Sequence, residues 1–368
     1  MESLKLMKNK IISLFLISLF VLLTSVTVNA DTKVVVIPLL GGDTASISND
    51  TARISNIVTV AKSGGDFTDP VAAMKSITDA SFTNPYIIFI APGTYTISET
   101  LQVKNNVNLI GAGKEITTIT VPVSSDVNTT INVEVGGGLN GPIIENLTIQ
   151  NIRNGSSCIG IRTRSIILRN SIVEVRGCTS FSTGIIDFFI ADIEGSNIIV
   201  SGGNTAIGVM ADSFGGPFVL TNSKISVIGG NSTAARVTQA DIKRSSLVVD
   251  TVNFSGGTDN LIGIDLEFFG GATEASVVNS DISINPLARG VGSAIGVNAV
   301  GETRVSVRGS RVESTNTALS SEGDSPITVS QSTIIGGTVG NEITCVASDN
   351  GAGLELDNNC DILTLGPS

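Results

Sequence analysis

The sequence predicts an all-β fold, a parallel β-helix in which short strands stack coil upon coil. A turn-to-strand unit recurs along most of the chain, and a second column of Gly-aliphatic pairs recurs about once per unit. Gly, Ser, Thr, Asn, Val and Ile dominate the composition, whereas strong helix formers are sparse. Because each coil pairs with the coils on either side, no coil buries its apolar face alone.

The repeating unit is defined by anchor positions that lie 22 to 30 residues apart. The anchors are Leu147, Ser171, Ser196, Ser223, Asp250, Ser280, Ser310 and Ser332. Three residues before them stand Ile144, Leu168, Ile193, Leu220, Leu247, Val277, Val307 and Val329. Two residues after them stand Ile149, Val173, Ile198, Ile225, Val252, Ile282, Val312 and Ile334. Alternate residues of a strand point to opposite faces, so both aliphatic sets are expected to point inward.

A tight bend is expected just before each anchor. Asn or Gly stands there in six units: Asn146, Asn170, Gly195, Asn222, Asn279 and Gly309. These residue types tolerate the left-handed backbone that joins two strands of one coil. The second column supports the same register and is expected to open another strand of each coil: Gly160-Ile161, Gly184-Ile185, Gly208-Val209, Gly263-Ile264 and Gly296-Val297.

The N-terminal region predicts export. Lys5, Lys8 and Lys10 precede the apolar run 11–23, and the small-residue pattern 28–30 indicates cleavage after Ala30. An uncleaved membrane anchor is the alternative, but the run is short for a membrane span, and no transmembrane segment is expected in the mature chain. We therefore expect a signal peptide over 1–30, a tail or added strand over 31–55, and a β-helix domain over 56–368.

The ends of a solenoid need caps, because open strand edges favour aggregation. Near the N-terminal end, Asp69-Pro70 predicts the start of a short helix, with Val71, Met74 and Ile77 on its apolar face. A C-terminal cap is expected around 340–368. Four cysteines in an exported chain suggest two disulfides, and the sequential pairs Cys158–Cys178 and Cys345–Cys360 are preferred over buried free thiols.

Composition also excludes some functions. The formal net charge of −11 argues against nucleic acid as a partner. The chain contains no His, which excludes Ser-His-Asp and Cys-His catalysis, and it contains no Trp.

The stretch 57–120 resembles the opening of pectin methylesterases and related pectin-lyase-fold proteins. The resemblance rests on the segments 60–67 (VAKSGGDF), 86–90 (YIIFI), 92–95 (PGTY), 107–113 (VNLIGAG) and 117–119 (TTI). It covers about a fifth of the mature chain. It implies a single-stranded, right-handed, pectin-lyase-like β-helix, and most of its residues belong to the cap and the first coils.

In such esterases one aspartate acts as nucleophile and a second as acid and base. The run 184–189 (GIIDFF) is similar to the motif around the nucleophile, so the resemblance would make Asp187 catalytic. However, the run 162–169 one coil earlier holds neither Asp nor Gln, and the family's Trp-containing motif is missing. Asp187 also shares the inward parity of Ile185, so we expect a structural role for it.

A second candidate site combines Asp212, Asp265 and Glu267, which the register places on the outward face. Clustered carboxylates favour Ca²⁺, and pectate lyases of this fold use calcium. A solvated charged face is the preferred interpretation, so no cofactor is expected, with Ca²⁺ as the exception.

These observations predict an exported, non-catalytic β-helix protein that forms a structural or polysaccharide-contacting surface. It would reside in the extracellular space, on the cell surface or in the periplasm, with extracellular polysaccharide as the expected partner. The alternative is a divergent pectinesterase-like or pectate-lyase-like enzyme that acts on extracellular acidic polysaccharide.

Overall fold

The computed structural model describes residues 56–133, 141–211, 218–250, 259–266, 273–285, 291–340 and 342–360. The chain divides into two units, Met1–Ala52 and Arg53–Ser368, and all described residues belong to the second. The predicted signal peptide and the tail over 31–55 lie outside the described residues. None of the described helices is long and apolar enough to span a membrane.

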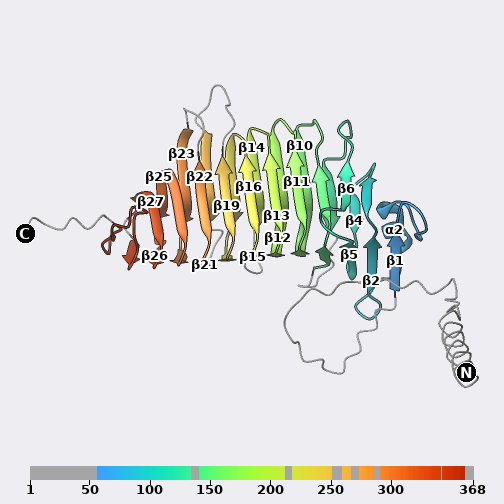
Figure 1. Cartoon of the computed structure of the whole chain (residues 1–368), viewed down its shortest axis with the longest axis horizontal. Helices are drawn as coiled ribbons and strands as arrows, with labels where there is room; N and C mark the ends of the chain where they lie inside the picture. Colours follow the sequence, from blue (N-terminus) through green and yellow to red (C-terminus); the bar gives the residue numbers. More distant parts are fainter. Residues whose placement is uncertain are drawn as a thin grey trace, which may run out of the picture. The chain divides into compact units, whose positions relative to one another are not determined.

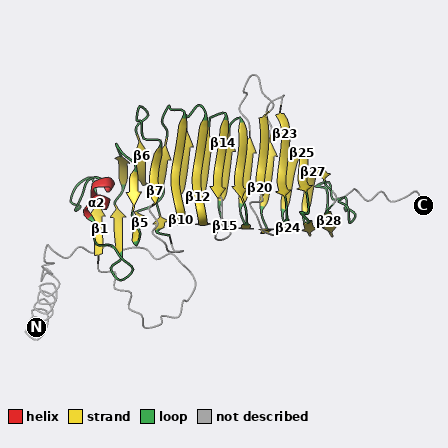
Figure 2. Ribbon diagram, turned by 180° about the vertical axis from the view of Figure 1, so that it is seen from behind, coloured by secondary structure: helices red, strands yellow, loops and turns green. Residues whose placement is uncertain are grey.

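The second unit is a right-handed parallel β-helix with three faces. Its coils follow one another in chain order, from blue to red in Figure 1. Every pairing between its named strands is parallel, as expected when each coil pairs with its neighbours. Figure 2 shows the same stack from behind, with a single short helix at the N-terminal end of the described residues.

The first face precedes the tight corner of each coil. The C-terminal parts of β10 (Ser157–Arg169) and β12 (Phe181–Glu194) belong to it. Its other strands are β1 (Asn56–Val60), β2 (Tyr86–Ile90), β5 (Val107–Gly111), β8 (Ile143–Glu145), β15 (Phe218–Thr221), β18 (Ala240–Lys243), β21 (Thr273–Val278), β24 (Thr303–Arg308), β26 (Ile327–Ser330) and β28 (Ile343–Val346).

The second face follows the corner. The N-terminal parts of β25 (Arg311–Glu322) and β27 (Thr333–Val339) belong to it. Its other strands are β3 (Gly93–Thr96), β6 (Thr117–Val121), β9 (Thr148–Asn151), β11 (Ile172–Arg176), β13 (Asn197–Ser201), β16 (Lys224–Ile228), β19 (Ser246–Asp250) and β22 (Asp281–Asn285).

The third face closes each coil. It holds the N-terminal parts of β10 and β12 and the C-terminal parts of β25 and β27. Its other strands are β4 (Leu101–Val103), β7 (Thr129–Val133), β14 (Thr205–Ala211), β17 (Asn231–Val237), β20 (Asp259–Leu266) and β23 (Val291–Val300).

The two predicted aliphatic columns form the core in seven of the eight units. Each is fully or almost fully buried, as at Ile144, Leu168 and Ile193 before the corner and Ile149, Val173 and Ile198 after it. Burying an aliphatic side chain of this size stabilises the fold by about 1.5–3 kcal/mol. The six predicted Asn and Gly corner residues all have a left-handed φ, between 42° and 60°.

A ladder of serine side chains runs behind the corners. In each corner from Leu147 to Ser332, with Ser245 in the place of the predicted anchor Asp250, the backbone N–H donates to the Oγ of the serine one coil further on; the last acceptor is Ser348. These bonds satisfy buried N–H groups at a bend that the strand ladder cannot reach. The ladder thus fixes the register of successive corners.

The anchor predicted at Asp250 is wrong, and the ladder passes through Ser245 instead. Leu220 pairs with Ile242, and Ile225 pairs with Leu247, which places Leu247 after the corner rather than before it. Ile242 and Leu247 stand three residues before and two residues after Ser245. Leu247 and Val252 stand at the same offsets from Asp250, so the aliphatic pattern fits both registers. The left-handed residue before Ser245 is Arg244, which carries no Asn or Gly signal.

The glycine column lies inside strands rather than at their starts. β10 has 13 residues and β12 has 14, and both run from the third face to the first through the glycine position. Two coils have alanine at this position instead of glycine. Ala234 lies between the coils of Gly208 and Gly263, Ala318 lies in the coil after Gly296, and both are fully buried. A Cβ on Gly184 would lie 2.6 Å from Ile198 Cγ2 of the second face, so the two faces come very close here.

The N-terminal end carries the helix α2 (Pro70–Ser76). Asp69 is its N-cap and accepts a hydrogen bond from Val71 N at 3.1 Å. Val71, Met74 and Ile77 are buried, and the helix packs against β1, β2 and β4. The apolar face therefore covers the first coils.

Two disulfides confirm the predicted pairs. The Cα atoms of Cys158 and Cys178 are 5.8 Å apart, and those of Cys345 and Cys360 are 5.1 Å apart. The second pair ties β28 to the segment that follows it, where Asn358 accepts a hydrogen bond from Cys345 N at 3.1 Å. The expected C-terminal cap is thus described as far as Cys360.

Candidate functional site

Asp187 lies on the inner side of the third face. In register it sits between Thr163 and Ala211, as the parity of Ile185 predicts, and its exposed fraction is 1%. Its Oδ1 accepts a hydrogen bond from Phe189 N at 3.2 Å. Because this carboxylate faces the core, it cannot contact a polymer that binds on the outer surface of the protein.

The proposed acidic patch is only partly described. Asp212 and Glu267 lie outside the described residues, so their position relative to Asp265 remains a prediction. Asp265 was expected to be exposed, but only 8% of it is accessible. Arg236 and Asn298 stand beside it on the neighbouring coils, and Asn298 Nδ2 donates to Asp265 Oδ1 at 2.8 Å. Asp265 is therefore buried between its neighbours on the adjacent coils although its parity is outward.

Within the described ranges, no group of three or more Asp, Glu, Cys or His side chains lies close enough to hold a metal ion. The Ca²⁺ prediction therefore rests on the positions of Asp212 and Glu267, which the structure does not describe.

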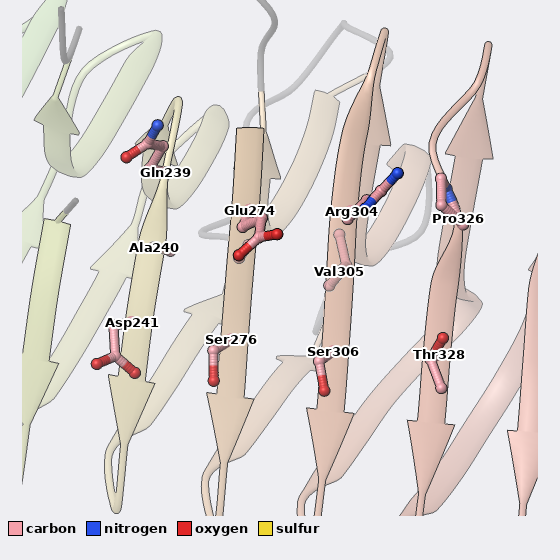
Figure 3. A pocket seen from close by; sticks show the side chains of 11 residues that line it. Gln239, Ala240, Asp241, Glu274, Ser276, Arg304, Val305, Ser306, Pro326 and Thr328 are labelled. Atoms are coloured by element: carbon pink, nitrogen blue, oxygen red, sulfur yellow. The ribbon is translucent and has the colours of Figure 1, made fainter. Parts of the chain in front are cut away.

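A different feature is hollowed into the outer side of the first face. A cavity of about 640 Å³ lies across β18, β21, β24 and β26 (Figure 3). We call it the face groove, and it is lined by Gln239, Ala240, Asp241, Glu274, Ala275, Ser276, Arg304, Val305, Ser306, Pro326 and Thr328. The four strands come from four successive coils, so residues far apart in the chain meet here.

The polar side chains of the face groove form two rows. One row is Asp241, Ser276, Ser306 and Thr328, which are in register on neighbouring strands. The other row contains Gln239, Glu274, Arg304 and Pro326. Ser276 and Ser306 are short, so the middle of the face is low between longer side chains.

Two charged groups of the face groove, Glu274 and Arg304, remain available to a ligand. Glu274 and Arg304 are partners in register, yet no ion pair joins them within the described part of the chain. Figure 3 shows the Arg304 side chain extending towards Pro326, away from Glu274. Asp241, in contrast, forms an ion pair with Lys243 at 2.6 Å. The groove thus offers a guanidinium, a carboxylate, an amide and several hydroxyls.

This set of groups can bind a polyhydroxylated ligand. Carboxylate and hydroxyl oxygens accept hydrogen bonds from hydroxyls, whereas guanidinium and amide N–H groups donate to them.

The row of Asp241 extends beyond the face groove. Two coils nearer the N-terminus, Asp192 occupies the same row as Asp241. Burial raises the pKa of the Asp192 carboxyl above its usual value, while Arg169 opposes that rise and Glu194 adds to it.

Sequence reasoning missed the face groove. Its residues occur four and six positions before the ladder serine of each coil, and all are common surface types. The signal was hidden by the shifted anchor at Asp250, which takes Gln239 and Asp241 out of register with Glu274 and Ser276.

Comparison with known proteins identifies a family. The sequence profile of the family described as rhamnogalacturonase A/epimerase, pectate lyase-like matches residues 42–254, more than half of the chain. No curated protein sequence matches the chain.

Solved structures with a similar chain trace include pectin methylesterases and a pectate lyase. The enzyme from carrot is 14% identical, with a TM-score of 0.42, over 82% of this chain and 92% of that chain. The Erwinia chrysanthemi enzyme is 15% identical, with a TM-score of 0.36, over 83% and 92%. The pectate lyase is 13% identical, with a TM-score of 0.37, over 85% and 88%. These likenesses are too distant to indicate an activity for this chain.

Proposed function

We propose that this chain, which belongs to the rhamnogalacturonase A/epimerase, pectate lyase-like family, is an exported protein that contacts extracellular polysaccharide without converting it. The observation that carries the proposal is the burial of Asp187, the residue that the esterase-like motif would make the nucleophile. A nucleophile must reach the scissile bond of its substrate, and this carboxylate faces the core.

The face groove supports the contact part of the proposal. It crosses four coils, so its rows of polar groups repeat at the strand spacing of about 4.8 Å. A linear polysaccharide also presents hydroxyls at regular intervals, and Glu274 and Arg304 are placed to exchange hydrogen bonds with them. Two disulfides support export, because disulfides persist in oxidising compartments outside the cytosol.

Catalysis is tested directly with the mature protein. We expect no methanol release from methyl-esterified pectin, and no unsaturated uronides from pectate in the presence of Ca²⁺. Either product would contradict the proposal and favour the alternative of a divergent esterase or lyase. In that case, loss of activity in Asp187→Ala without unfolding would locate the reaction at Asp187.

Binding through the face groove is tested with point variants. Arg304→Ala and Glu274→Ala should each weaken binding of plant cell-wall polysaccharide by about tenfold, the loss expected for one charge-assisted hydrogen bond. Arg308→Ala is the matched control, because Arg308 is exposed on the same strand and lies outside the groove. Equal binding by Arg304→Ala and the control would exclude the face groove as the contact surface.

Export is tested by locating the protein and sequencing its N-terminus. The mature chain should be found outside the cytoplasm and should begin at Asp31. A chain that retains Met1 and fractionates with membranes would support the uncleaved anchor instead.

A further inference from the structure

Asn154 and Gly155 lie in the corner that joins β9 to β10, between the second and third faces. Asn followed by Gly is the dipeptide in which an asparagine side chain most readily reacts with the next backbone nitrogen, because glycine has no Cβ to hinder the approach. The chain contains such pairs at 140–141, 154–155 and 350–351, and the structure describes both residues of the last two. The fold holds these two pairs very differently.

The reacting groups of the pair at 154–155 have no partner to leave. The Asn154 side chain is exposed. Within the described ranges, neither its amide nor the Gly155 N–H takes part in a hydrogen bond. Only the rest of the corner backbone is held: Asn154 N donates to Val123 O at 3.1 Å, and Thr179 N donates to Gly155 O at 2.9 Å. The side-chain amide and the nitrogen that would attack it are therefore both available.

The pair at 350–351 is held by three hydrogen bonds. Gly351 N, the nitrogen that would attack, donates to Asp349 Oδ1 at 2.7 Å. The Oδ1 of Asn350 accepts from Ala352 N at 3.1 Å and from Leu354 N at 3.2 Å. These bonds have to open before Gly351 N can reach the side-chain amide, and opening them costs free energy. The same dipeptide is therefore protected here and unprotected at Asn154.

A buried cation lies against the unprotected pair. Arg153 is only 8% exposed, and a Cβ on Gly155 would lie 2.7 Å from its Nε, so the guanidinium fills the place of a side chain at the glycine. Backbone bond lengths of about 1.5 Å then put the Gly155 nitrogen within about 6 Å of Nε. Within the described part of the chain, the one hydrogen bond of this guanidinium runs from Nη1 to Ser125 O at 2.9 Å, and the buried Nε has no acceptor.

The charge of Arg153 favours a reaction between Asn154 and Gly155 in two ways. A nearby positive charge stabilises the deprotonated form of the Gly155 amide, which is the nucleophile. After the reaction, a carboxylate stands on the residue next to a guanidinium that has no carboxylate partner among the described residues. The attraction between these two charges favours the product.

We propose that Asn154 is a site of self-modification, at which the folded chain converts asparagine to aspartate and isoaspartate without an enzyme. The Gly155 nitrogen loses its proton to solvent and forms a bond to Asn154 Cγ. The C–N bond of the side-chain amide breaks, and ammonia leaves with a proton taken from solvent, which gives a five-membered imide. Water then opens the imide. Opening at Cγ gives aspartate, and opening at the backbone carbonyl gives isoaspartate, so one water is consumed and one ammonia is released.

The modification changes the corner in charge and in length. It adds one negative charge, and isoaspartate lengthens the backbone by one carbon between the hydrogen bonds to Val123 and Thr179. The disulfide Cys158–Cys178 joins the same coil to the next one, so the two coils stay linked while the corner changes. This site is independent of the face groove and of any bound ligand.

The experiment follows two asparagines in the same molecules. The mature protein is kept in neutral buffer, samples are digested at acidic pH, and mass spectrometry measures the acid forms of the peptides that contain Asn154 and Asn350. In the folded protein, Asn154 should convert at least about tenfold faster than Asn350, because the hydrogen bonds of the protected pair must open first. Isoaspartate should accompany aspartate at position 154. In the reduced chain unfolded in guanidinium chloride, the two rates should agree within about threefold, because the native hydrogen bonds are absent.

Arg153→Gln tests the role of the cation, with Arg153→Lys as the matched variant that keeps the charge. Arg153→Gln should slow the conversion of Asn154 by about threefold, the effect of a unit charge at this distance in water. Arg153→Lys should convert at the wild-type rate. A variant that only loosens the fold would speed conversion of both asparagines, so the Asn350 rate separates loss of charge from loss of structure.

Conversion of Asn154 no faster than that of Asn350 in the folded protein would overturn the proposal. So would aspartate without isoaspartate, because direct hydrolysis of the side-chain amide would then be the source. Equal rates at Asn154 in Arg153→Gln and in the wild type would overturn the role given to Arg153.

Discussion

At the scale of single residues, the serine ladder decides the register of the corners. The Oγ of each ladder serine accepts a hydrogen bond from a buried backbone N–H of the preceding coil. The same hydroxyl donates to the carbonyl two residues back in its own chain segment. An aliphatic residue at the same place, such as Leu147, can end the ladder but cannot continue it, since it offers no acceptor. Among the described corners from Ser171 to Ser348, every coil meets this requirement with serine.

Replacing Ser245 tests this role. Ser245→Ala leaves the buried Ser223 N–H without its acceptor, which now lies at 3.2 Å. We expect a loss of about 1–3 kcal/mol in the free energy of unfolding. Urea unfolding followed by circular dichroism measures the loss. Ser246→Ala, one residue further on the outer side, is the control and should change stability by about 0.5 kcal/mol or less. Equal effects would contradict the ladder at Ser245.

At the scale of elements, the glycine column marks the places where the core has no room for a side chain. β10 and β12 each cross from the third face to the first, and the glycine column lets the second face approach their backbone. Ala234 and Ala318 show that the space is not identical in every coil, because a methyl group fits there. The glycines thus report close packing between faces rather than the beginnings of strands.

Gly208 provides the test at this scale. A Cβ on Gly208 would lie 2.5 Å from the Ala234 carbonyl oxygen, which is backbone and cannot move aside. Gly208→Ala should therefore destabilise the protein by about 1–3 kcal/mol, as overpacking does. Gly337→Ala is the control, since its nearest contact is the Asn316 carbonyl oxygen at 3.2 Å and the site is exposed. Thermal unfolding that ranks the two variants the other way would refute this explanation.

At the scale of the whole molecule, stability is distributed along the stack. A solenoid is held by contacts between neighbouring coils, so its ends open more easily than its middle. The disulfide Cys345–Cys360 closes 15 residues of chain beside the last described coil, whereas Cys158–Cys178 lies further inside. The terminal bridge is therefore expected to protect the end of the stack.

Removing the terminal bridge tests this expectation. Cys345→Ala with Cys360→Ala should lower the free energy of opening of the last coils by about 3 kcal/mol, the chain-entropy value for such a loop. Hydrogen exchange followed by mass spectrometry should show faster exchange in β27 and β28 and no change in β13 or β16. Uniformly faster exchange along the chain would mean that the stack unfolds as one cooperative unit.

Several features could be predicted from the amino-acid sequence: the fold class, the inward aliphatic columns, six corner residues, the disulfide pairs and the inward direction of Asp187. These features follow from local chemistry, because strand parity, left-handed backbone and cysteine count are readable within one repeat. The corner at Ser245, the burial of Asp265 and the face groove became visible only in the folded chain. Each of these depends on which residues face each other on neighbouring coils. Consecutive ladder serines lie between 16 and 35 residues apart, so the length of the intervening loops, rather than any local pattern, sets those partners.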